Sequence, residues 1–311
     1  MTSLSRPHVH MIEVVTRDGF QSEPRFIPTE DKIALIDQMS QAGYHAIEVT
    51  SFTNPKAIPM LADAEAVLQG IRRNPDVEYT ALIPNVRGAE RALKVGVDAF
   101  NLVMSVSESH NQANLRTSRE NSFKQHQEVI LLAQDGKVPV NASLSTCFGC
   151  SIEGTVTQEE VLKWVQRFAD LGVRGVSLCD TTGMANPAAV GQLCEKALTL
   201  CPDMEVTLHF HNTRGMGLAN VVTAVQAGVR HFDASLGGLG GCPYAPGATG
   251  NICTEDAVHM LELMGYNTGL DLNALLAMSA RLEELVQRTL PSQLLRAGPI
   301  WKNRSVCSVP A

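Results

Sequence analysis

The sequence predicts a single (β/α)₈ barrel, the TIM-barrel fold, with an additional helix at its C-terminal end. Eight short apolar runs alternate with longer amphipathic stretches along the 311 residues, and no change in composition interrupts this alternation. Short runs rich in Val, Ile and Leu are typical of parallel strands that are buried on both faces. Eight such strands, each followed by a helical stretch, favour one closed barrel.

The expected strands share a high content of β-branched and apolar residues. They are His8–Val15, Ala46–Phe52, Glu78–Ile83, Ala99–Val106, Val138–Leu144, Gly175–Cys179, Val206–Phe210 and His231–Leu236.

The stretches between these strands have the polar and apolar periodicity of helices that cover a sheet. The expected helices include Thr29–Gln41, Asn54–Ile71, Ser118–Gln134, Thr157–Leu171, Pro187–Leu200 and Gly217–Ala227.

Residues that favour helix ends occur at both ends of these stretches. Thr29, Asn54, Ser118 and Thr157 stand where an N-cap is expected, and Glu160 would complete a capping box with Thr157. A glycine, which can supply the left-handed residue that ends a helix, precedes the next strand at Gly43, Gly96, Gly172 and Gly228. A further helix from Asp271 to about Thr289 and a tail follow the last unit, so we expect one domain over residues 1–311.

A doubly wound open sheet is the alternative architecture. It would need a glycine-rich phosphate loop after the first strand. The segment there, Arg17-Asp-Gly-Phe-Gln21, is not such a loop.

Composition excludes several classes of function. A formal net charge of −7 argues against a nucleic-acid-binding surface as the main function. No apolar run approaches the length of a membrane span, and the first ten residues lack the pattern of a signal peptide. The scattered cysteines are typical of reduced thiols in a cytoplasm. Cys147 and Cys150 form a C-x-x-C pair without a second pair, so a strand end and its loop are favoured over a metal or redox site.

Polar residues gather where the expected strands end, which is the position of catalytic residues in such barrels. They follow the first, second, fourth, sixth, seventh and eighth strands, as Arg17-Asp18, Glu48-Val-Thr-Ser51, Ser107-Glu-Ser-His-Asn111, Asp180-Thr-Thr182, His209-Phe-His211-Asn212 and the glycine-rich Gly237–Gly250.

The two histidines after the seventh strand indicate a metal site. Residues i and i+2 of a strand point to the same side, so His209 and His211 can both face the barrel mouth. Asp18 follows the first strand, which adjoins the eighth in a closed barrel, and Asn251 offers a further oxygen. This mixture of ligands suits Mg²⁺ or Mn²⁺ better than a structural zinc. The alternative is a pair of hydrogen-bonded core histidines.

The loop Gly237–Gly250 contains one cysteine, Cys242. Its glycines and its place after the eighth strand suggest a mobile lid that brings this thiol to the chemistry. The alternative is a loop cysteine without a function.

At these motifs the sequence resembles the 3-hydroxy-3-methylglutaryl-CoA lyases, from about Ile12 to Thr268. The motifs are Arg17-Asp-Gly-Phe-Gln21, Ile47-Glu-Val-Thr-Ser-Phe52, Ser107-Glu-Ser-His-Asn111, Asp180-Thr-Thr-Gly183 and, most specifically, Gly238-Leu-Gly-Gly-Cys-Pro-Tyr-Ala-Pro-Gly-Ala-Thr-Gly-Asn251.

The resemblance implies cleavage of a 3-hydroxyacyl-CoA to acetyl-CoA and a keto acid by metal-assisted retro-Claisen chemistry. It implies Asp18, His209, His211 and Asn251 as ligands of Mg²⁺ or Mn²⁺. Catalytic roles are expected for Arg17, which would stabilise the enolate, for Cys242 in proton transfer, and for Asp180 and Glu48. Glu255 matches a further polar residue of the pocket. Substrate-binding roles are assigned to Gln21, Ser51, Asn111 and Arg214.

The family resemblance also implies partners and a cellular context. An acyl-CoA substrate, a homodimer, a cytoplasmic location and a place in leucine catabolism are expected, with neither nucleic acid nor membrane as partner.

Departures from the family pattern leave the exact substrate open. Asn212 and Arg214 replace a carboxylate and an aromatic residue, and the loop Gly149-Cys-Ser-Ile-Glu-Gly154 lacks the usual Pro-aromatic pair. The alternatives are a lyase for citramalyl-CoA or another 3-hydroxy-3-alkylglutaryl-CoA, a barrel synthase that condenses acetyl-CoA with a 2-oxo acid, and a catalytically silent scaffold.

Overall fold

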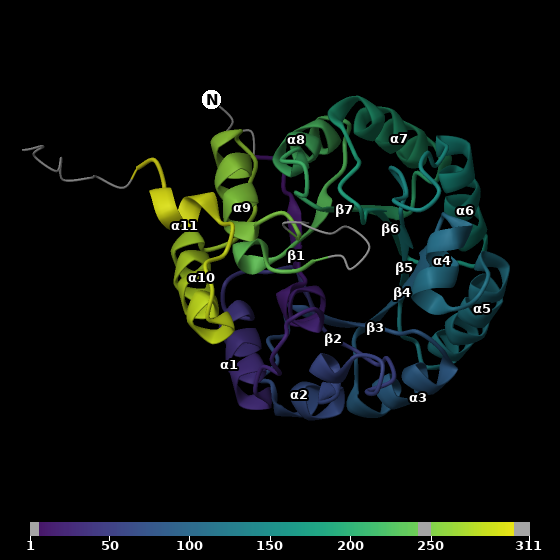
Figure 1. Cartoon of the computed structure of the whole chain (residues 1–311), viewed down its shortest axis with the longest axis horizontal. Coiled ribbons are helices and arrows are strands. Elements are labelled where there is room, and N and C mark those ends of the chain that lie inside the picture. The colour runs from purple at the N-terminus through teal and green to yellow at the C-terminus, as the bar shows by residue number, and fades with distance from the viewer. Residues whose placement is uncertain (1–5, 242–249, 302–311) are drawn as a thin grey trace, which may run out of the picture.

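Eight parallel strands close into one barrel in chain order (Figure 1). The computed structural model describes residues 6–241 and 250–301. The strands are β1 (His10–Glu13), β2 (Ala46–Ser51), β3 (Glu78–Leu82), β4 (Ala99–Ser105), β5 (Val140–Ser145), β6 (Gly175–Asp180), β7 (Glu205–Phe210) and β8 (His231–Ala234). The first and last strands pair in register from His10 opposite His231 to Glu13 opposite Ala234. This pairing confirms the TIM barrel and excludes the open sheet.

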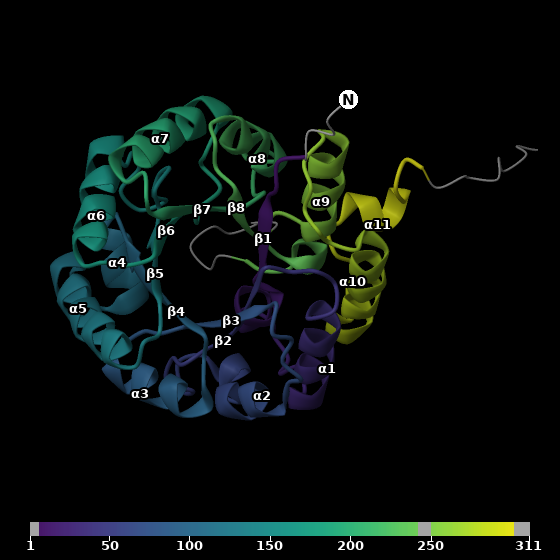
Figure 2. The same ribbon diagram turned by 180° about the vertical axis from the view of Figure 1, so that it is seen from behind.

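Helices surround the barrel on its outer side, as both end-on views show (Figures 1 and 2). They are α1 (Thr29–Met39), α2 (Ala64–Gly70), α3 (Val86–Val95), α4 (Glu108–Leu115), α5 (Arg119–Asp135), α6 (Gln158–Asp170), α7 (Pro187–Leu200), α8 (Gly217–Gln226), α9 (Thr254–Leu263), α10 (Leu272–Val286) and α11 (Gln293–Ala297). Among the described residues, no helix is both long enough and apolar enough to span a membrane.

The expected helix Asn54–Ile71 is wrong over its first half. A turn after Asn54 and a short 3₁₀ helix, Pro59–Leu61, precede α2. The cause is proline, because Pro55 and Pro59 remove backbone donors and restrict the residues before them.

Of the expected N-cap residues, Ser118 and Thr157 are confirmed and Thr29 is wrong. The Ser118 and Thr157 side chains accept from the backbone N–H groups of Asn121 and Glu160. Thr29 is instead the first residue of α1, and its hydroxyl donates a hydrogen bond of 2.8 Å to the Asp63 carboxylate.

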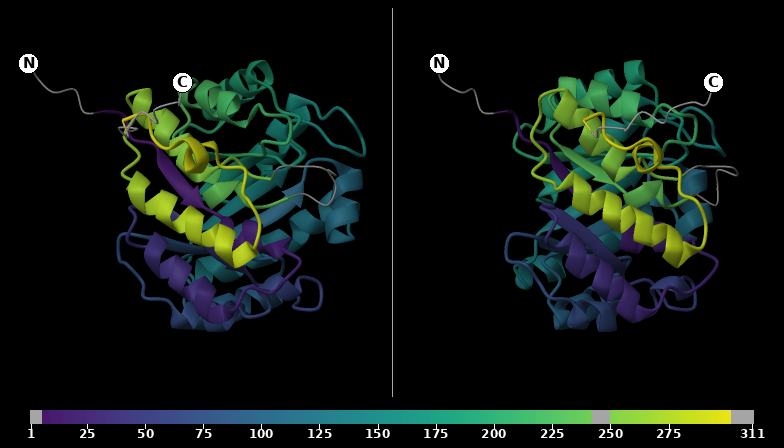
Figure 3. Two further views of the ribbon diagram at one scale, coloured as in Figure 1. Left: turned by 60° about the vertical axis from the view of Figure 1, so that its left-hand side comes forward. Right: turned by 90° about the vertical axis from the view of Figure 1, so that its left-hand side faces the viewer.

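The additional C-terminal helix is confirmed as α10, whose N-cap residue Asp271 accepts from the N–H groups of Asn273 and Ala274. It packs against α1 and α9, and the side views show it alongside the barrel (Figure 3). The last helices therefore cover the side of the barrel where the first and last strands meet.

The barrel interior is polar, whereas the space between strands and helices is apolar. An interior cavity has polar residues from most strands in its wall, among them Glu48, Thr80, Asn101, Ser177, Thr207 and Asp233. Buried apolar residues of the strands, such as Leu102 and Leu208, belong to one cluster with helix residues such as Trp164. The apolar cluster stabilises the fold, which leaves the interior free to hold polar groups.

Glu13 joins the end of β1 to three other segments. One carboxylate oxygen accepts from the N–H groups of Val15 and Leu236, at 2.9 and 3.0 Å. The other accepts from the hydroxyls of Tyr44 and Thr254, at 2.7 and 2.8 Å. Burial raises the pKa of Glu13 to about 7, against the effect of these hydrogen bonds.

Candidate active site at the carboxyl ends of the strands

Three potential metal ligands meet at the carboxyl ends of the strands. One ligand atom each of Asp18, His209 and His211 lies within 4.8 Å of the other two, and all three residues are buried. The predicted cluster is therefore present in the fold.

The local backbone explains how these side chains converge. His209 lies in β7 and His211 follows it two residues later, so both imidazoles point the same way. Asp18 lies in a single π-helical turn, Val15–Gly19, directly after β1. In this turn the N–H of Gly19 reaches the carbonyl of Val14, which is five residues earlier.

Asn251 is brought to the cluster by backbone pairing. It forms an isolated antiparallel bridge with His211, and the N–H of Ile252 donates to Phe210. The Asn251 amide is 2.7 Å from Asp18 Oδ2, and a Cβ at Gly240 would lie 2.5 Å from the amide nitrogen. Glycine at position 240 thus makes room for this side chain.

These residues fit a divalent cation. The Nε2 atoms of His209 and His211 are 3.1 Å apart, and two ligands at right angles on an ion at about 2.1 Å are about 3 Å apart. Among the described residues, the buried His211 Nδ1 has no hydrogen-bond partner. Burial is the main cause that lowers the pKa of His211 to about 4, and the neighbouring His209 adds to this effect. The imidazole is therefore in the neutral form that binds metals.

Arg17 lies between two carboxylates at the edge of the cluster. Its Nε donates to Glu48 Oε2 and its Nη1 donates to Asp18 Oδ1, and each donor–acceptor distance is 2.5 Å. Glu48 Oε1 also accepts from Asn101 over 2.7 Å. Because both carboxylates hold the guanidinium, its orientation toward the cluster is fixed.

Burial and charge act in opposite directions on these carboxylates. Burial alone would raise the pKa of Asp18, but the positive charge of Arg17, the largest opposing effect, helps to lower it to about 2. Burial raises the pKa of Glu48 despite its contact with Arg17. Asp18 is therefore ionised at neutral pH, as a metal ligand must be.

Asp180, the last residue of β6, has one oxygen available for chemistry. Its Oδ1 accepts from the N–H groups of Met184 and Ala185, at 2.7 and 3.0 Å. Its buried Oδ2 has no partner among the described residues. Burial raises the pKa of Asp180 to about 6, which is close to the range of a general base at neutral pH.

The predicted substrate-binding residues occupy different positions. Gln21 donates to Asp18 Oδ1 over 2.9 Å and so lies at the cluster. Ser51 hydrogen-bonds Thr53 in the loop after β2. The exposed Arg214 donates to the carbonyl oxygens of Thr182 and Gly183, and thereby joins the loops after β6 and β7 at the rim.

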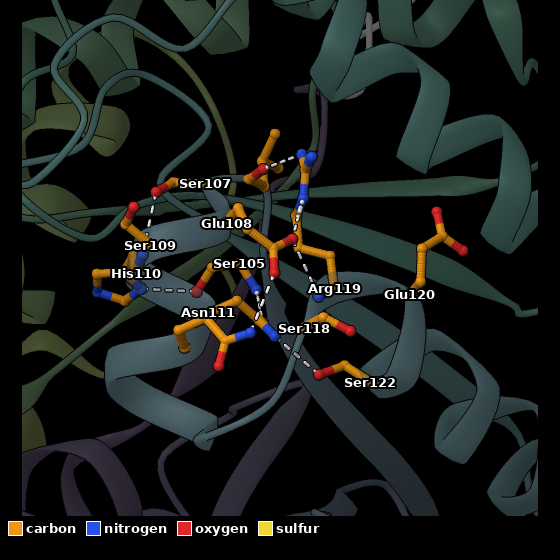
Figure 4. A network of polar contacts seen from close by, with 12 residues as sticks. Ser105, Ser107, Glu108, Ser109, His110, Asn111, Ser118, Arg119, Glu120 and Ser122 are labelled. Atoms are coloured by element: carbon orange, nitrogen blue, oxygen red, sulfur yellow. Dashed lines mark hydrogen bonds and ion pairs between the residues drawn. The ribbon is translucent and has the colours of Figure 1, made fainter.

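Asn111 is buried in a network around α4 (Figure 4). Its oxygen accepts from the N–H of Ser105, and its amide donates to Thr117 and Ser122. These contacts fix the loop between β4 and α5, and none of them joins Asn111 to the metal cluster.

The remaining candidates divide between described and undescribed residues. Cys242 lies outside the described residues. Glu255 is buried in α9, where its Oε2 accepts from the N–H of Gly237 over 3.1 Å. Both cysteines of the C-x-x-C pair are buried. The Cys147 thiol donates a hydrogen bond to the carbonyl oxygen of Leu144, and Cys150 Sγ accepts one from the Ser107 hydroxyl. This agrees with the prediction of a strand end and its loop.

Asp233 is a residue of the site that the sequence analysis missed. It lies in β8 directly opposite His209, and its Oδ2 is 3.1 Å from His209 Nδ1. Burial would lower the pKa of His209, but the hydrogen bond to Asp233 raises it. A carboxylate that hydrogen-bonds the ring nitrogen not used for the metal fixes the tautomer and the orientation of a metal-binding histidine. The only pointer to Asp233 was its position opposite His209 in the pairing of β7 with β8. The sequences of the two strands do not specify this register.

Comparison with known proteins identifies the family. The family model described as HMGL-like matches residues 8–282. The chain belongs to this family. The resemblance to hydroxymethylglutaryl-CoA lyases found in its motifs is thus confirmed, as is its assignment as a lyase of that type.

Relatives in this family are similar over nearly the full chain. Hydroxymethylglutaryl-CoA lyase YngG of Bacillus subtilis is 46% identical, over 91% of this chain and 95% of its own. (R)-citramalyl-CoA lyase of Chloroflexus aurantiacus is 38% identical, over 94% of this chain and 96% of its own. The structure of an HMG-CoA lyase from Acinetobacter baumannii in complex with coenzyme A and 3-methylmalate superposes with a TM-score of 0.94 at 46% identity, covering 98% of this chain and 100% of that one.

Proposed function

We propose that this chain cleaves 3-hydroxy-3-methylglutaryl-CoA, or a closely related 3-hydroxyacyl-CoA, into acetyl-CoA and a keto acid. The observation that carries the proposal is the convergence of Asp18, His209 and His211, with Arg17 bound to Asp18 and the available oxygen of Asp180 on β6, the strand beside β7. Chelation, charge stabilisation and proton transfer are the three requirements of a retro-Claisen cleavage, and this site offers a group for each.

Asp18, His209, His211 and Asn251 would hold a divalent cation, for which we propose Mg²⁺ or Mn²⁺. When bound, such an ion acidifies a hydroxyl and polarises a carbonyl oxygen of the substrate. Asp233 would hold His209 in the tautomer that leaves Nε2 free for the ion.

Asp180 would accept the proton of the 3-hydroxyl group. Its Oδ1 is held by two backbone N–H groups, so Oδ2 is the oxygen that can take the proton. As the hydroxyl oxygen forms the carbonyl of the keto acid, the C2–C3 bond breaks and its electron pair passes to the thioester part of the substrate.

Arg17 would stabilise the negative charge that then develops on the thioester oxygen. A preorganised charged donor acts most strongly at a site shielded from water, and the Arg17 side chain is 10% exposed. The enolate is completed to acetyl-CoA by a proton at C2, for which we propose the Cys242 thiol as donor or relay.

A cleavage assay tests the proposal. Protein treated with a chelator is assayed against several 3-hydroxyacyl-CoA thioesters, with and without added Mg²⁺ or Mn²⁺, and acetyl-CoA is measured. We expect cleavage of a 3-hydroxy-3-alkyl thioester that depends on the metal. Metal binding without cleavage of any thioester would favour the condensing synthase or the scaffold.

A citramalyl-CoA lyase is the second candidate. It is supported by the 38% identity to the citramalyl-CoA lyase of Chloroflexus aurantiacus and by Arg214, a cation at the rim of the site. The ratio of kcat/KM for the two thioesters separates the candidates. If Arg214 recognises a substrate carboxylate, Arg214→Gln should change this ratio and not the metal dependence.

The finer expectations also belong to the proposal. We infer a homodimer, a cytoplasmic location and a place in leucine catabolism from the family resemblance. Sedimentation of the purified protein tests the dimer, and growth of a deletion strain on leucine tests the pathway.

A further inference from the structure

A second group of histidines lies at the opposite end of the barrel, where the strands begin. His10 is the first residue of β1, His231 is the first residue of β8, and His45 directly precedes β2. One ligand atom of each lies within 4.8 Å of the other two. Three segments that are distant in the sequence thus place imidazoles together where the barrel closes.

The rings form a compact group. His10 stacks on His231 with ring centroids 4.8 Å apart, and His45 is 4.6 Å from His10 and 5.9 Å from His231. His10 and His231 are half-buried and His45 is exposed. The group can therefore be reached from solvent, and its outer member has room to rotate.

The imidazoles of His10 and His231 are neutral at physiological pH. Burial and the charge of the neighbouring histidines lower the pKa of both His10 and His231 to about 4. A cluster of this kind cannot take up several protons without strong repulsion, whereas neutral imidazole nitrogens can all donate to one metal ion. The Glu205 carboxylate, with Oε2 3.6 Å from His231 Nε2, adds negative charge beside the group, and Arg174 adds positive charge that lowers the pKa of His231.

We propose that His10, His45 and His231 bind a transition-metal ion of the Zn²⁺ class at the amino-terminal end of the barrel. A site of three imidazoles favours Zn²⁺, Ni²⁺ and Cu²⁺ over Mg²⁺, which prefers oxygen ligands such as those that Asp18 and Asn251 offer at the first site. Nitrogen ligands of a tetrahedral Zn²⁺ lie about 3.3 Å apart, so the rings, whose ligand atoms now lie within 4.8 Å of one another, would rotate to bind one ion. Water would fill the fourth position.

Such an ion would connect the strands at the closure of the barrel. β1 pairs with β8 on one side and with β2 on the other. A ligand that binds only the folded state stabilises it, and this one would join the first and last strands directly. The site would be structural and separate from the site at the carboxyl ends.

Zn²⁺ binding by tag-free protein tests the inference. After chelator treatment, equilibrium dialysis against Zn²⁺ should give one more ion per chain for the wild type than for His45→Ala, an exposed substitution that preserves the fold. His259→Ala, which removes a half-buried histidine on α9, is the matched control and should retain the wild-type number. Equal Zn²⁺ binding by the wild type and by His45→Ala would overturn the proposal.

A stability measurement separates this site from the proposed active site. In the His211→Ala background, which disables the first cluster, Zn²⁺ should still raise Tm, and adding His45→Ala should remove that increase. If the His211→Ala protein fails to fold, the comparison is made between wild type and His45→Ala under Mg²⁺ saturation. A Zn²⁺-dependent rise in Tm of the same size with and without His45 would contradict the proposal.

Discussion

The two ends of the barrel carry similar side chains in different surroundings. At the carboxyl end, Arg17 lies between Asp18 and Glu48, and its side chain is 10% exposed. At the amino end, Arg174 forms two hydrogen bonds with Glu78, and its side chain is 35% exposed. Each end thus pairs an arginine with carboxylates, but only the carboxyl end shields the pair from water.

The histidine and carboxylate pairs repeat this difference. His209 and Asp233 are 3.1 Å apart and each is 9% exposed, whereas His231 and Glu205 are 3.6 Å apart and about one-fifth exposed. Charges interact more strongly where water is excluded. Burial, rather than residue type alone, therefore distinguishes the proposed catalytic end, and substitutions at both ends can test this difference.

The largest expected effect is the loss of a metal ligand. His211→Ala should reduce metal-dependent kcat/KM by about 10³-fold or more, because charge stabilisation by the ion is worth several kcal/mol. The measurement is thioester cleavage at saturating Mn²⁺, with circular dichroism as a check on the fold. His259→Ala is the control and should keep its activity. An unchanged rate for His211→Ala would refute the ligand assignment.

Asp180→Asn should slow cleavage by about 10²- to 10⁴-fold, the contribution of a general base. Because the pKa of Asp180 is raised to about 6, its carboxylate is protonated below that pH and ionised above it. The wild-type kcat/KM should therefore fall as the pH drops through 6, and this limb should be absent from Asp180→Asn. Asp170→Asn, at the exposed end of α6, should leave the profile unchanged. An identical acid limb in Asp180→Asn would assign the base elsewhere.

Arg17→Gln should cost about 3–4 kcal/mol of transition-state stabilisation, or about 10²- to 10³-fold in kcat. Arg174→Gln makes the same change at the amino end, and there we expect lower stability but unchanged turnover per folded molecule. The two kcat values, corrected for the folded fraction from urea unfolding, give the test. Equal losses from both substitutions would break the comparison between the ends.

Glu13 should make folding stability depend on pH. Its pKa in the folded state is raised from 4.5 to about 7, so its contribution is complete below 4.5 and is lost as the pH rises through 7. A shift of this size corresponds to about 3 kcal/mol between pH 4.5 and pH 8. Urea unfolding at several pH values should show that Glu13→Gln removes this slope. Glu65→Gln changes a surface ion pair and should retain it, and parallel slopes for wild type and Glu13→Gln would contradict the prediction.

The smallest effect is expected for Asp233→Asn. Loss of a hydrogen-bond partner behind a metal-binding histidine typically weakens metal affinity by about 10- to 100-fold. Mn²⁺ titration measures this affinity, and Glu205→Gln, beside His231, should leave it unchanged. Equal Mn²⁺ affinity in Asp233→Asn and wild type would show that Asp233 does not position His209.

The parts of the site that follow from local periodicity were predictable from the sequence. The i and i+2 spacing of His209 and His211 is a property of one strand, and closure of the barrel makes Asp18 their neighbour. Asn251 depends on a bridge to His211, which lies 40 residues earlier in the chain, and the sequence indicated it largely through family resemblance. Asp233 was missed because its role depends on the register of two strands.

The same distinction applies to the fold. The alternation of strands and helices specified the barrel, because it repeats along the whole chain. The region after Asn54 was assigned to one helix because its apolar spacing is helical, but Pro59 ends that pattern and α2 begins only at Ala64. Local steric restrictions there were stronger than periodicity.

The π-helical turn at Val15–Gly19 makes this stretch of the chain sensitive to insertions and deletions. It holds one residue more than an α-helical turn, and this extra residue lets Arg17 and Asp18, which are adjacent in sequence, both reach the same cluster. Deleting one residue would rotate the following backbone by about 100° and turn Gln21 away from Asp18. When relatives are aligned, a gap between Val14 and Gln21 is therefore a stronger sign of lost activity than a substitution there.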